Sequence, residues 1–267
     1  MRRIVAGLIT GLVVAAVFSV SPPASASVQL VPSYFYPTGN PNPWNVMCGR
    51  MSKSGSGSIA ILNPASGPGR RANPAYAAAL ADCHLDGQRV IGYVATRDTR
   101  QSIAKLEKEI DAYFSFYPTI DGIFLDNMAQ VPTARASCKR CTMTVEAYYS
   151  MLYVHVHDKG PNVTVFANPG APATTSWQLS TPAADGVVTF EGSSASYQTY
   201  APPPWVLDEP ADKIANIVYG APISSLASDC STAAGDNAGL LYVTDLNLRP
   251  NPYDALPTYW TTETATC

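Results

Sequence analysis

The chain has 267 residues, a formal net charge of −3 and a hydrophobic fraction of 46%, which is typical of a globular protein and excludes a disordered one. No stretch of the sequence is strongly basic, so we expect no nucleic-acid partner. An anionic polymer is also disfavoured by this charge, and a neutral or cationic substrate fits better.

The N-terminal segment resembles a secretory signal peptide. Arg2 and Arg3 precede an apolar run over 4–20, and a small-x-small site follows at Ala24-Ser25-Ala26. The alternative is an uncleaved membrane anchor, since the run is nearly long enough to span a bilayer. We predict a signal peptide at 1–26 and a secreted, extracellular protein at 27–267 that is not held at a membrane after cleavage.

The rest of the chain alternates between strand and helix patterns. Short apolar segments predict eight strands, at 29–36, 58–63, 89–96, 122–126, 162–168, 186–191, 215–219 and 239–246. Helical patterns are clearest at 74–85, 99–116 and 145–159. Most strands read as continuous apolar runs, the pattern of parallel strands covered on both faces. The sequence therefore predicts an α/β fold, a single-domain (β/α)8 TIM barrel at 27–267, whose usual length is about 250 residues. An open doubly wound sheet is the alternative, weakened because no G-x-G-x-x-G follows a strand.

Two kinds of turn distinguish the two ends of this barrel. Asp-Gly precedes predicted strands at 86–87, 121–122 and 185–186, where it predicts tight turns on the face remote from function. Asn-Pro follows predicted strands at 63–64 and 168–169, and these turns are expected on the face that carries active sites. We also assign the Pro-rich patch at 202–204 to a loop of that face.

Six cysteines, at 48, 83, 138, 141, 230 and 267, suggest up to three disulfides in an exported chain. Cys138 and Cys141 have the spacing of a zinc or redox motif, but a second ligand pair is missing. We predict a local disulfide between them and leave the other pairings open.

Three carboxylates end an apolar strand: Asp126, Glu191 and Asp245. Charged side chains there lose solvent unless they have partners, so they serve either chemistry or structural support in the barrel mouth. Asp126 and Glu191 would face each other across the mouth, and glycoside hydrolysis needs such a pair. We predict Glu191 as acid/base and Asp126 as nucleophile or electrostatic stabiliser. The sequence leaves a retaining or an inverting outcome open.

Other chemistries find less support. No G-x-S-x-G elbow is present. His155 and His157 lie two residues apart on a predicted helix and point away from each other, so they are not expected to share a metal ion. His84 precedes a turn and is interpreted as structural. We expect no metal site and no cofactor.

Sugar binding requires aromatic faces and fixed polar groups. The predicted mouth and its strand ends offer such groups for substrate binding at Tyr36, Asn63, Tyr93, Asn127, Asn168, Trp205, Tyr219 and Asp245.

Several segments resemble the spherulation-specific family 4, or spherulin-4-like, proteins. The matching pieces are VPSYFYP at 31–37, AILNPASGPG at 60–69, VIGYVATR at 90–97, DGIFLDN at 121–127, ANPG at 167–170 and VVTFE at 187–191. The resemblance implies a β/α barrel and endo-acting hydrolysis of an exopolysaccharide that contains galactosamine or N-acetylgalactosamine. Asp126 and Glu191 match the family pattern, but Asn127 stands where the family has Glu.

Three functions follow from these observations. The first is a secreted glycoside hydrolase, expected to be a monomer with a polysaccharide as its partner. The second, motivated by Asn127, is a catalytically inactive barrel that binds polysaccharide. The third is a secreted structural or cell-surface interaction protein.

Overall fold

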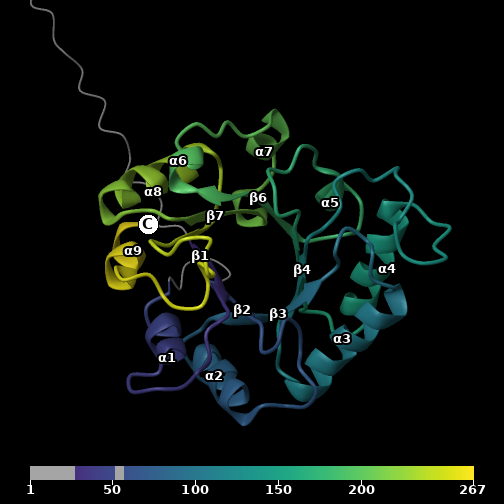
Figure 1. The fold of residues 1–267 in the computed structure, drawn as a ribbon, viewed down its shortest axis with the longest axis horizontal. Coiled ribbons are helices and arrows are strands. Elements are labelled where there is room, and N and C mark those ends of the chain that lie inside the picture. The colour runs from purple at the N-terminus through teal and green to yellow at the C-terminus, as the bar shows by residue number, and fades with distance from the viewer. Residues whose placement is uncertain (1–27, 52–56) are drawn as a thin grey trace, which may run out of the picture.

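The computed structural model describes residues 28–51 and 57–267, so the predicted signal peptide lies outside the described residues. Eight parallel strands pair in chain order, and β8 pairs with β1 to close a barrel (Figure 1). The strands are β1 (Val28–Ser33), β2 (Ile59–Leu62), β3 (Arg89–Ala95), β4 (Gly122–Asp126), β5 (Thr164–Asn168), β6 (Gly186–Ser193), β7 (Ile214–Tyr219) and β8 (Leu240–Val243). The predicted (β/α)8 barrel is confirmed.

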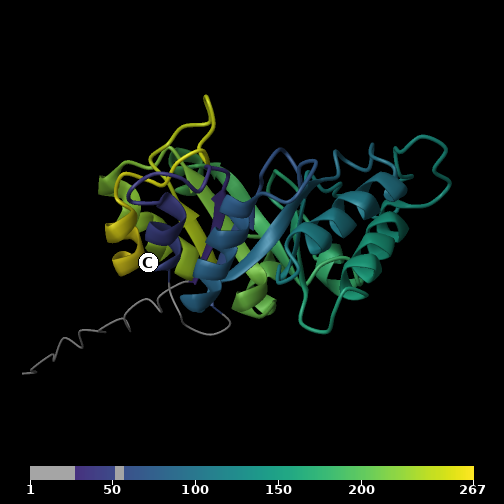
Figure 2. The same cartoon turned by 90° about the horizontal axis from the view of Figure 1, so that it is seen from below.

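Helices surround the strands in Figure 1. They are α1 (Pro43–Cys48), α2 (Pro74–Leu85), α3 (Ile103–Phe116), α4 (Val145–His157), α5 (Trp177–Ser180), α6 (Ser194–Tyr197), α7 (Pro204–Asp208), α8 (Leu226–Gly235) and α9 (Trp260–Thr266). Two 3-10 turns, Ala211–Lys213 and Ile223–Ser225, precede β7 and α8. The predicted Pro-rich loop contains the start of α7. Figure 2 shows the chain after β8, in yellow, rising above the barrel at one edge.

The packing of α3 on β3 shows how the helical layer meets the barrel. Leu106, Ile110 and Tyr113 are buried at helical spacing along one side of α3. A Cβ at Gly92 in β3 would lie 2.7 Å from the Tyr113 ring, so glycine is needed for this close approach. The Tyr113 hydroxyl donates to the Leu62 carbonyl of β2 at 3.0 Å, which joins the helix to a second strand.

The predicted element boundaries differ from the structure in a few places. Helix α3 begins at Ile103 instead of residue 99, because Arg97, Asp98 and Thr99 all have positive φ, between 52° and 64°. Strand β6 continues to Ser193, two residues beyond its predicted end. The predicted first strand, 29–36, is shorter at its C-terminal end and stops at Ser33.

Asp-Gly turns lie at the starts of strands, as predicted. Asp121 accepts a hydrogen bond from the backbone N–H of Val90 at 2.7 Å, and its other near neighbour is His84 Nε2 at 2.8 Å. Asp185 likewise accepts from the Val165 N–H at 2.8 Å. Each carboxylate thus holds the start of a neighbouring strand. These acids serve the structural end of the barrel.

Three disulfides join the cysteines of the chain. The predicted local disulfide Cys138–Cys141 is present. Cys48–Cys83 links α1 to α2, and Cys230–Cys267 links α8 to the C-terminal residue.

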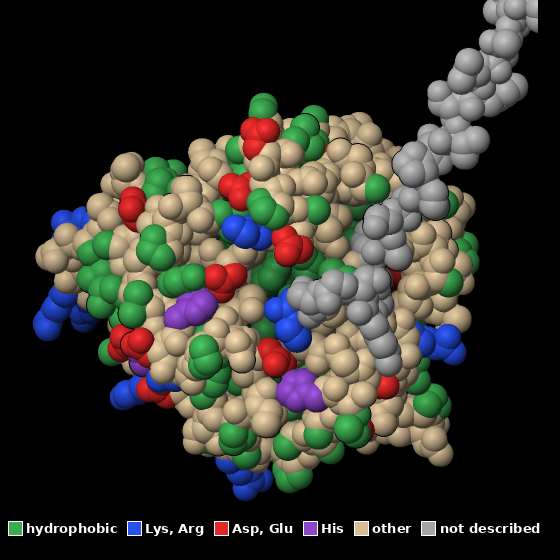
Figure 3. All heavy atoms as spheres, turned by 180° about the vertical axis from the view of Figure 1, so that it is seen from behind, with side chains coloured by type: hydrophobic (Ala, Val, Ile, Leu, Met, Phe, Trp, Pro, Cys, Tyr) green, Lys and Arg blue, Asp and Glu red, His purple; other side chains and the backbone are tan. Residues whose placement is uncertain are grey.

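Across 28–51 and 57–267, no helix has the length and hydrophobicity needed to cross a bilayer. On the face in Figure 3, basic and acidic side chains are interspersed.

Candidate functional site

Strand ends bring four polar side chains together at the mouth of the barrel. Asp126 is the last residue of β4 and Asn168 the last of β5, and the two are register partners. Tyr93 lies on β3 and Glu191 on β6. Because parallel strands end at the same edge, their terminal side chains meet there.

A bulge in β6 determines the direction of Glu191. The register with β7 shifts between Val188 and Phe190, so one extra residue interrupts the alternation of side chains. Phe190 packs against the Tyr197 and Tyr200 rings, with ring centres 4.7 and 4.9 Å away, outside the strands. Glu191 therefore points inward, toward the barrel axis.

A continuous chain of hydrogen bonds connects the polar groups. The Tyr93 hydroxyl donates to Asp126 Oδ2 at 2.6 Å, and the Tyr253 hydroxyl donates to Glu191 Oε1 at 2.6 Å. Between them, Asn168 Nδ2 donates to Asp126 Oδ1 at 2.9 Å and to Glu191 Oε2 at 2.8 Å. Since one nitrogen lies this close to both oxygens, Oδ1 and Oε2 are within 5.7 Å of each other.

The orientation of the Asn168 amide is fixed from its other side. Its Oδ1 accepts from the Gly170 N–H at 2.9 Å, so its Nδ2 faces the carboxylates. The sequence Asn168-Pro169-Gly170 thus forms a turn that holds one amide between two acids. Gly170 has a φ of 67°, a conformation that glycine adopts without strain.

These groups border an open cavity of about 290 Å³. Strands, together with Tyr34 directly after β1, contribute residues two positions apart, as the alternation of side chains requires: Pro32 and Tyr34, Phe124 and Asp126, and Ile217 and Tyr219. The remaining lining residues are Tyr93, Asn127, Asn168, Gly170, Glu191, Leu248 and Tyr253. The cavity combines apolar and aromatic walls with a few convergent polar groups, the usual composition of a ligand site.

Burial is the main influence on the pKa values of Asp126, Tyr93 and Tyr253, which line the cavity. Burial, and next the charge of Glu191, raise the pKa of Asp126 to about 6, against the opposing effect of the Tyr93 hydrogen bond. Burial and then the charge of Asp126 also raise the pKa of Tyr93 far above its ordinary value. Burial and then the charge of Glu191 raise the pKa of Tyr253 far above its ordinary value as well. Both tyrosines therefore stay protonated and donate to the carboxylates.

Comparison with known proteins identifies the family. Residues 29–267 match the family described as Spherulation-specific family 4. The chain belongs to this family. Spherulin-4 of Physarum polycephalum is 28% identical over 245 residues, which cover 88% of this chain and 68% of that protein.

The barrel fold of this chain is similar to the folds of several solved structures. The structure of Aspergillus clavatus Sph3 in complex with GalNAc has a TM-score of 0.72 and 24% identity, and covers 92% of this chain and 99% of that one. A psychrophilic glycoside hydrolase family 10 endo-β-1,4-xylanase has a TM-score of 0.51 and 10% identity, covering 89% and 96%. This member of the spherulation-specific family thus shares the barrel fold of these two structures.

The structure brings six of the ten predicted site residues to the cavity. They are Asp126, Glu191, Tyr93, Asn127, Asn168 and Tyr219.

Four predicted site residues lie outside the cavity lining. Tyr36 and Asn63 lie on the β1 and β2 loops, where Tyr36 lines a separate groove and the Asn63 side chain accepts from the Gly67 N–H at 2.9 Å. Trp205 lies on α7 and packs against the hydrophobic core. Asp245 accepts from the Thr258 N–H at 3.1 Å and fixes the segment before α9. Their assignment to substrate binding stays a prediction.

Two of the four tyrosines that line the cavity, Tyr34 and Tyr253, were not predicted from the sequence. Tyr34 lies two positions before Tyr36, and its ring packs edge-on against the Tyr93 and Tyr253 rings at 5.5 Å. The alternation of the first strand contained this information, because Pro32 and Tyr34 share a face. Tyr253 lies in an irregular segment after β8, where no periodic pattern marked it.

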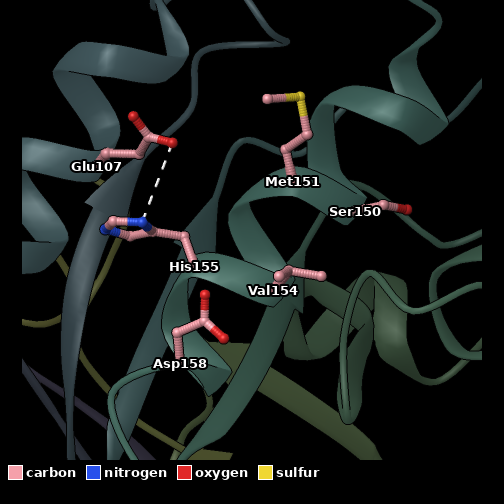
Figure 4. A pocket seen from close by; sticks show the side chains of 6 residues that line it. All are labelled: Glu107, Ser150, Met151, Val154, His155 and Asp158. Carbon is pink, nitrogen blue, oxygen red and sulfur yellow. Dashed lines mark ion pairs between the residues drawn. The ribbon is translucent and has the colours of Figure 1, made fainter.

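The histidines of α4 lie away from the cavity and pair with carboxylates. His155 Nε2 lies 2.8 Å from Asp111 Oδ1, and His157 Nε2 lies 3.0 Å from Asp185 Oδ2. Figure 4 shows His155 and Glu107 at a shallow hollow between α3 and α4 that also exposes Met151. In the described part of the chain, no group of three or more potential metal ligands occurs.

Proposed function

We propose that the chain is a secreted, endo-acting glycoside hydrolase that cleaves an exopolysaccharide containing galactosamine or N-acetylgalactosamine. Asp126 and Glu191 are its catalytic pair. The observation that carries the proposal is the Asn168 amide, which donates to both carboxylates at the edge of an open cavity. The GalNAc bound in the similar barrel of Sph3 supports an amino sugar as the substrate.

The chemistry follows from this pair. One carboxylic acid gives its proton to the glycosidic oxygen as the bond to the anomeric carbon breaks. The other carboxylate attacks that carbon and forms a glycosyl ester, which water then hydrolyses while the first residue takes a proton from the water. Retaining enzymes hold the two carboxyl groups roughly 5–5.5 Å apart, and inverting enzymes about 6.5–9.5 Å. Oδ1 of Asp126 and Oε2 of Glu191 lie within 5.7 Å of each other, close enough for both carboxylates to act on one glycosidic bond.

The roles of the two acids are open to a direct test. Sequence reasoning assigned the proton donor to Glu191. The pKa of Asp126, raised by burial to about 6, favours Asp126 instead, since a donor must hold its proton near neutral pH. Azide distinguishes the two cases. An alanine variant of the acid/base releases a glycosyl azide of retained configuration, whereas a variant of the nucleophile releases the inverted one.

The proposal is tested by incubating the purified chain with galactosaminogalactan, poly-N-acetylglucosamine and plant polysaccharides. We expect new reducing ends from the galactosamine-containing polymer. Asp126→Asn and Glu191→Gln should each lower the rate by about 10²–10⁴-fold or more without loss of folding. Near-wild-type rates in both variants would refute the assignment.

A second function, binding without cleavage, is favoured by Asn127. Its side chain lines the cavity where a third acid would otherwise stand, and an amide cannot exchange a catalytic proton. Asn127 has a φ of 50°, and its carbonyl accepts from Thr96 Oγ1 and the Asp98 N–H, both at 2.8 Å. This function predicts oligosaccharide binding by calorimetry with no reducing ends, and hydrolysis that appears in Asn127→Glu.

We also propose secretion as a monomer, with cleavage of the signal peptide at 1–26. The three disulfides support an oxidising compartment. Mass spectrometry of the secreted chain, with its N-terminus at Ser27, tests this proposal, and size-exclusion chromatography tests the oligomeric state.

A further inference from the structure

A second groove lies on the same face of the barrel as the catalytic cavity. It has a volume of about 450 Å³ and is bordered by Tyr36, by residues 64–65 and 68–73 of the loop between β2 and α2, and by Pro74 at the start of α2. Tyr34 lines the catalytic cavity and Tyr36 lines this groove. Two residues of extended chain span at most about 7 Å, so the two sites are neighbours.

Tyr36 presents a fixed aromatic surface to this groove. Its side chain is 49% exposed, and among the exposed large hydrophobic residues of the described chain Tyr36 is the one with an aromatic ring. The ring packs edge-on against Tyr76 at 5.4 Å, and Tyr76 packs edge-on against the buried Trp44 at 6.0 Å. The Tyr36 hydroxyl also meets the Asn73 side chain at 3.4 Å. The ring is thus supported from behind while its surface stays accessible, as a platform for a pyranose ring requires.

The charge of the groove is opposite to that of the cavity. Arg70 and Arg71 both line it and are exposed, and no acidic residue lies among its lining residues. The ion pairs within the described part of the chain include neither arginine. The guanidinium groups are therefore available to a ligand, and they suit the planar, bidentate binding of a carboxylate.

We propose that this groove is a substrate subsite for a carboxylate-bearing sugar residue, which stacks on Tyr36 and is held by Arg70 and Arg71. This inference rests on the proposed function, because it places the acidic sugar next to the residue that is cleaved. The polymer that fits both sites carries an amino sugar and a uronic acid within a few residues. The negative net charge of the chain pointed away from acidic polymers, but the local charge of the groove is positive.

Binding to the full mature chain tests the subsite without relying on catalysis. The probes are tetragalacturonate and its neutral counterpart galactotetraose, titrated calorimetrically into Glu191→Gln at low salt. We expect the acidic tetramer to bind at least tenfold more tightly than the neutral one, and 0.5 M NaCl to remove most of this preference. In the same background, Arg70→Ala/Arg71→Ala should abolish the preference, whereas Tyr36→Ala should weaken both tetramers.

Arg100→Ala is the matched control, since Arg100 is also exposed, lies on the next loop and pairs with Asp98 at 2.8 Å. It should bind both tetramers as Glu191→Gln alone does, and circular dichroism verifies the folding of every variant. Equal affinity for the two tetramers, or an unchanged preference in the double arginine variant, overturns the subsite. Tight binding of tetragalacturonate that depends on the two arginines supports the subsite even if no polysaccharide is hydrolysed. The absence of hydrolysis would then count only against the proposed glycoside hydrolase function.

Discussion

Replacing Asp126 by asparagine should remove activity and at the same time stabilise the fold above pH 6. Burial raises the pKa of Asp126 from 3.8 to about 6, so the folded protein favours the neutral acid. Below about pH 4 the group is protonated in both the folded and unfolded states and has no effect on their difference. As the pH rises from about 4 to 6, the unfolded state loses its proton first, and the free energy of unfolding falls.

The magnitude follows from this shift. A change of about two pKa units corresponds to roughly 3 kcal/mol at most, and we expect about 1–3 kcal/mol because the side chain retains some contact with solvent. Asparagine avoids this cost. Its oxygen can accept from Asn168, and its amide can donate to the Tyr93 hydroxyl once that hydroxyl rotates.

Thermal unfolding at pH 4 and pH 8 measures the effect. At pH 8, Asp126→Asn should melt roughly 2–10 °C above the wild type, and at pH 4 the two should melt together. Asp208→Asn is the control, because Asp208 is an exposed carboxylate at the end of α7 and should give no difference at either pH. An equal gain at both pH values, or a loss at pH 8, would refute the reasoning.

Three further variants test the structure of the site and the fold. Asn168→Ala should lower turnover by at least tenfold and move the acidic limb of the pH–rate profile to higher pH, because Asp126 and Glu191 lose a shared hydrogen-bond donor. A profile at the same pH as that of the wild type would contradict this. Gly122→Ala should destabilise the fold by several kcal/mol in denaturant unfolding, since its Cβ would lie 1.9 Å from a backbone oxygen of β5, and a wild-type midpoint would contradict the register. Removing Cys230–Cys267, 37 residues apart, should cost about 3–4 kcal/mol, whereas removing the disulfide that spans three residues should cost much less; equal losses would contradict the loop-closure argument.

The barrel could be predicted because the sequence patterns of its strands and turns are local and recur along the chain. Each strand is an apolar run, and the Asp-Gly turns mark one end and the Asn-Pro turns the other. Asp126 ends β4, so a polar residue at the end of an apolar run was enough to find it. Glu191 was found for the same reason, although the bulge in β6 that turns it inward has no sequence signature of its own.

Other parts of the site depend on contacts that no local pattern contains. Asp245 also follows an apolar run, yet it holds Thr258 in the C-terminal segment and does not line the cavity. Tyr253 reaches Glu191 from an irregular loop, 62 residues away in the chain. Trp205 was placed at the mouth by its loop, but α7 directs its ring to the core. In each case, packing between segments far apart in the chain determines where the side chain lies, and the hydrophobic periodicity of the sequence does not reveal it.

The central claim is that Asp126 and Glu191 act as one catalytic unit, and a double-mutant cycle tests it most directly. The rate of reducing-end release from a galactosamine-containing polysaccharide is measured for the wild type, Asp126→Asn, Glu191→Gln and the double variant. We predict that each single variant loses most of the rate and that the double variant is little slower than the worse single one. Losses that multiply in the double variant, or singles that keep near-wild-type rates, would contradict the claim.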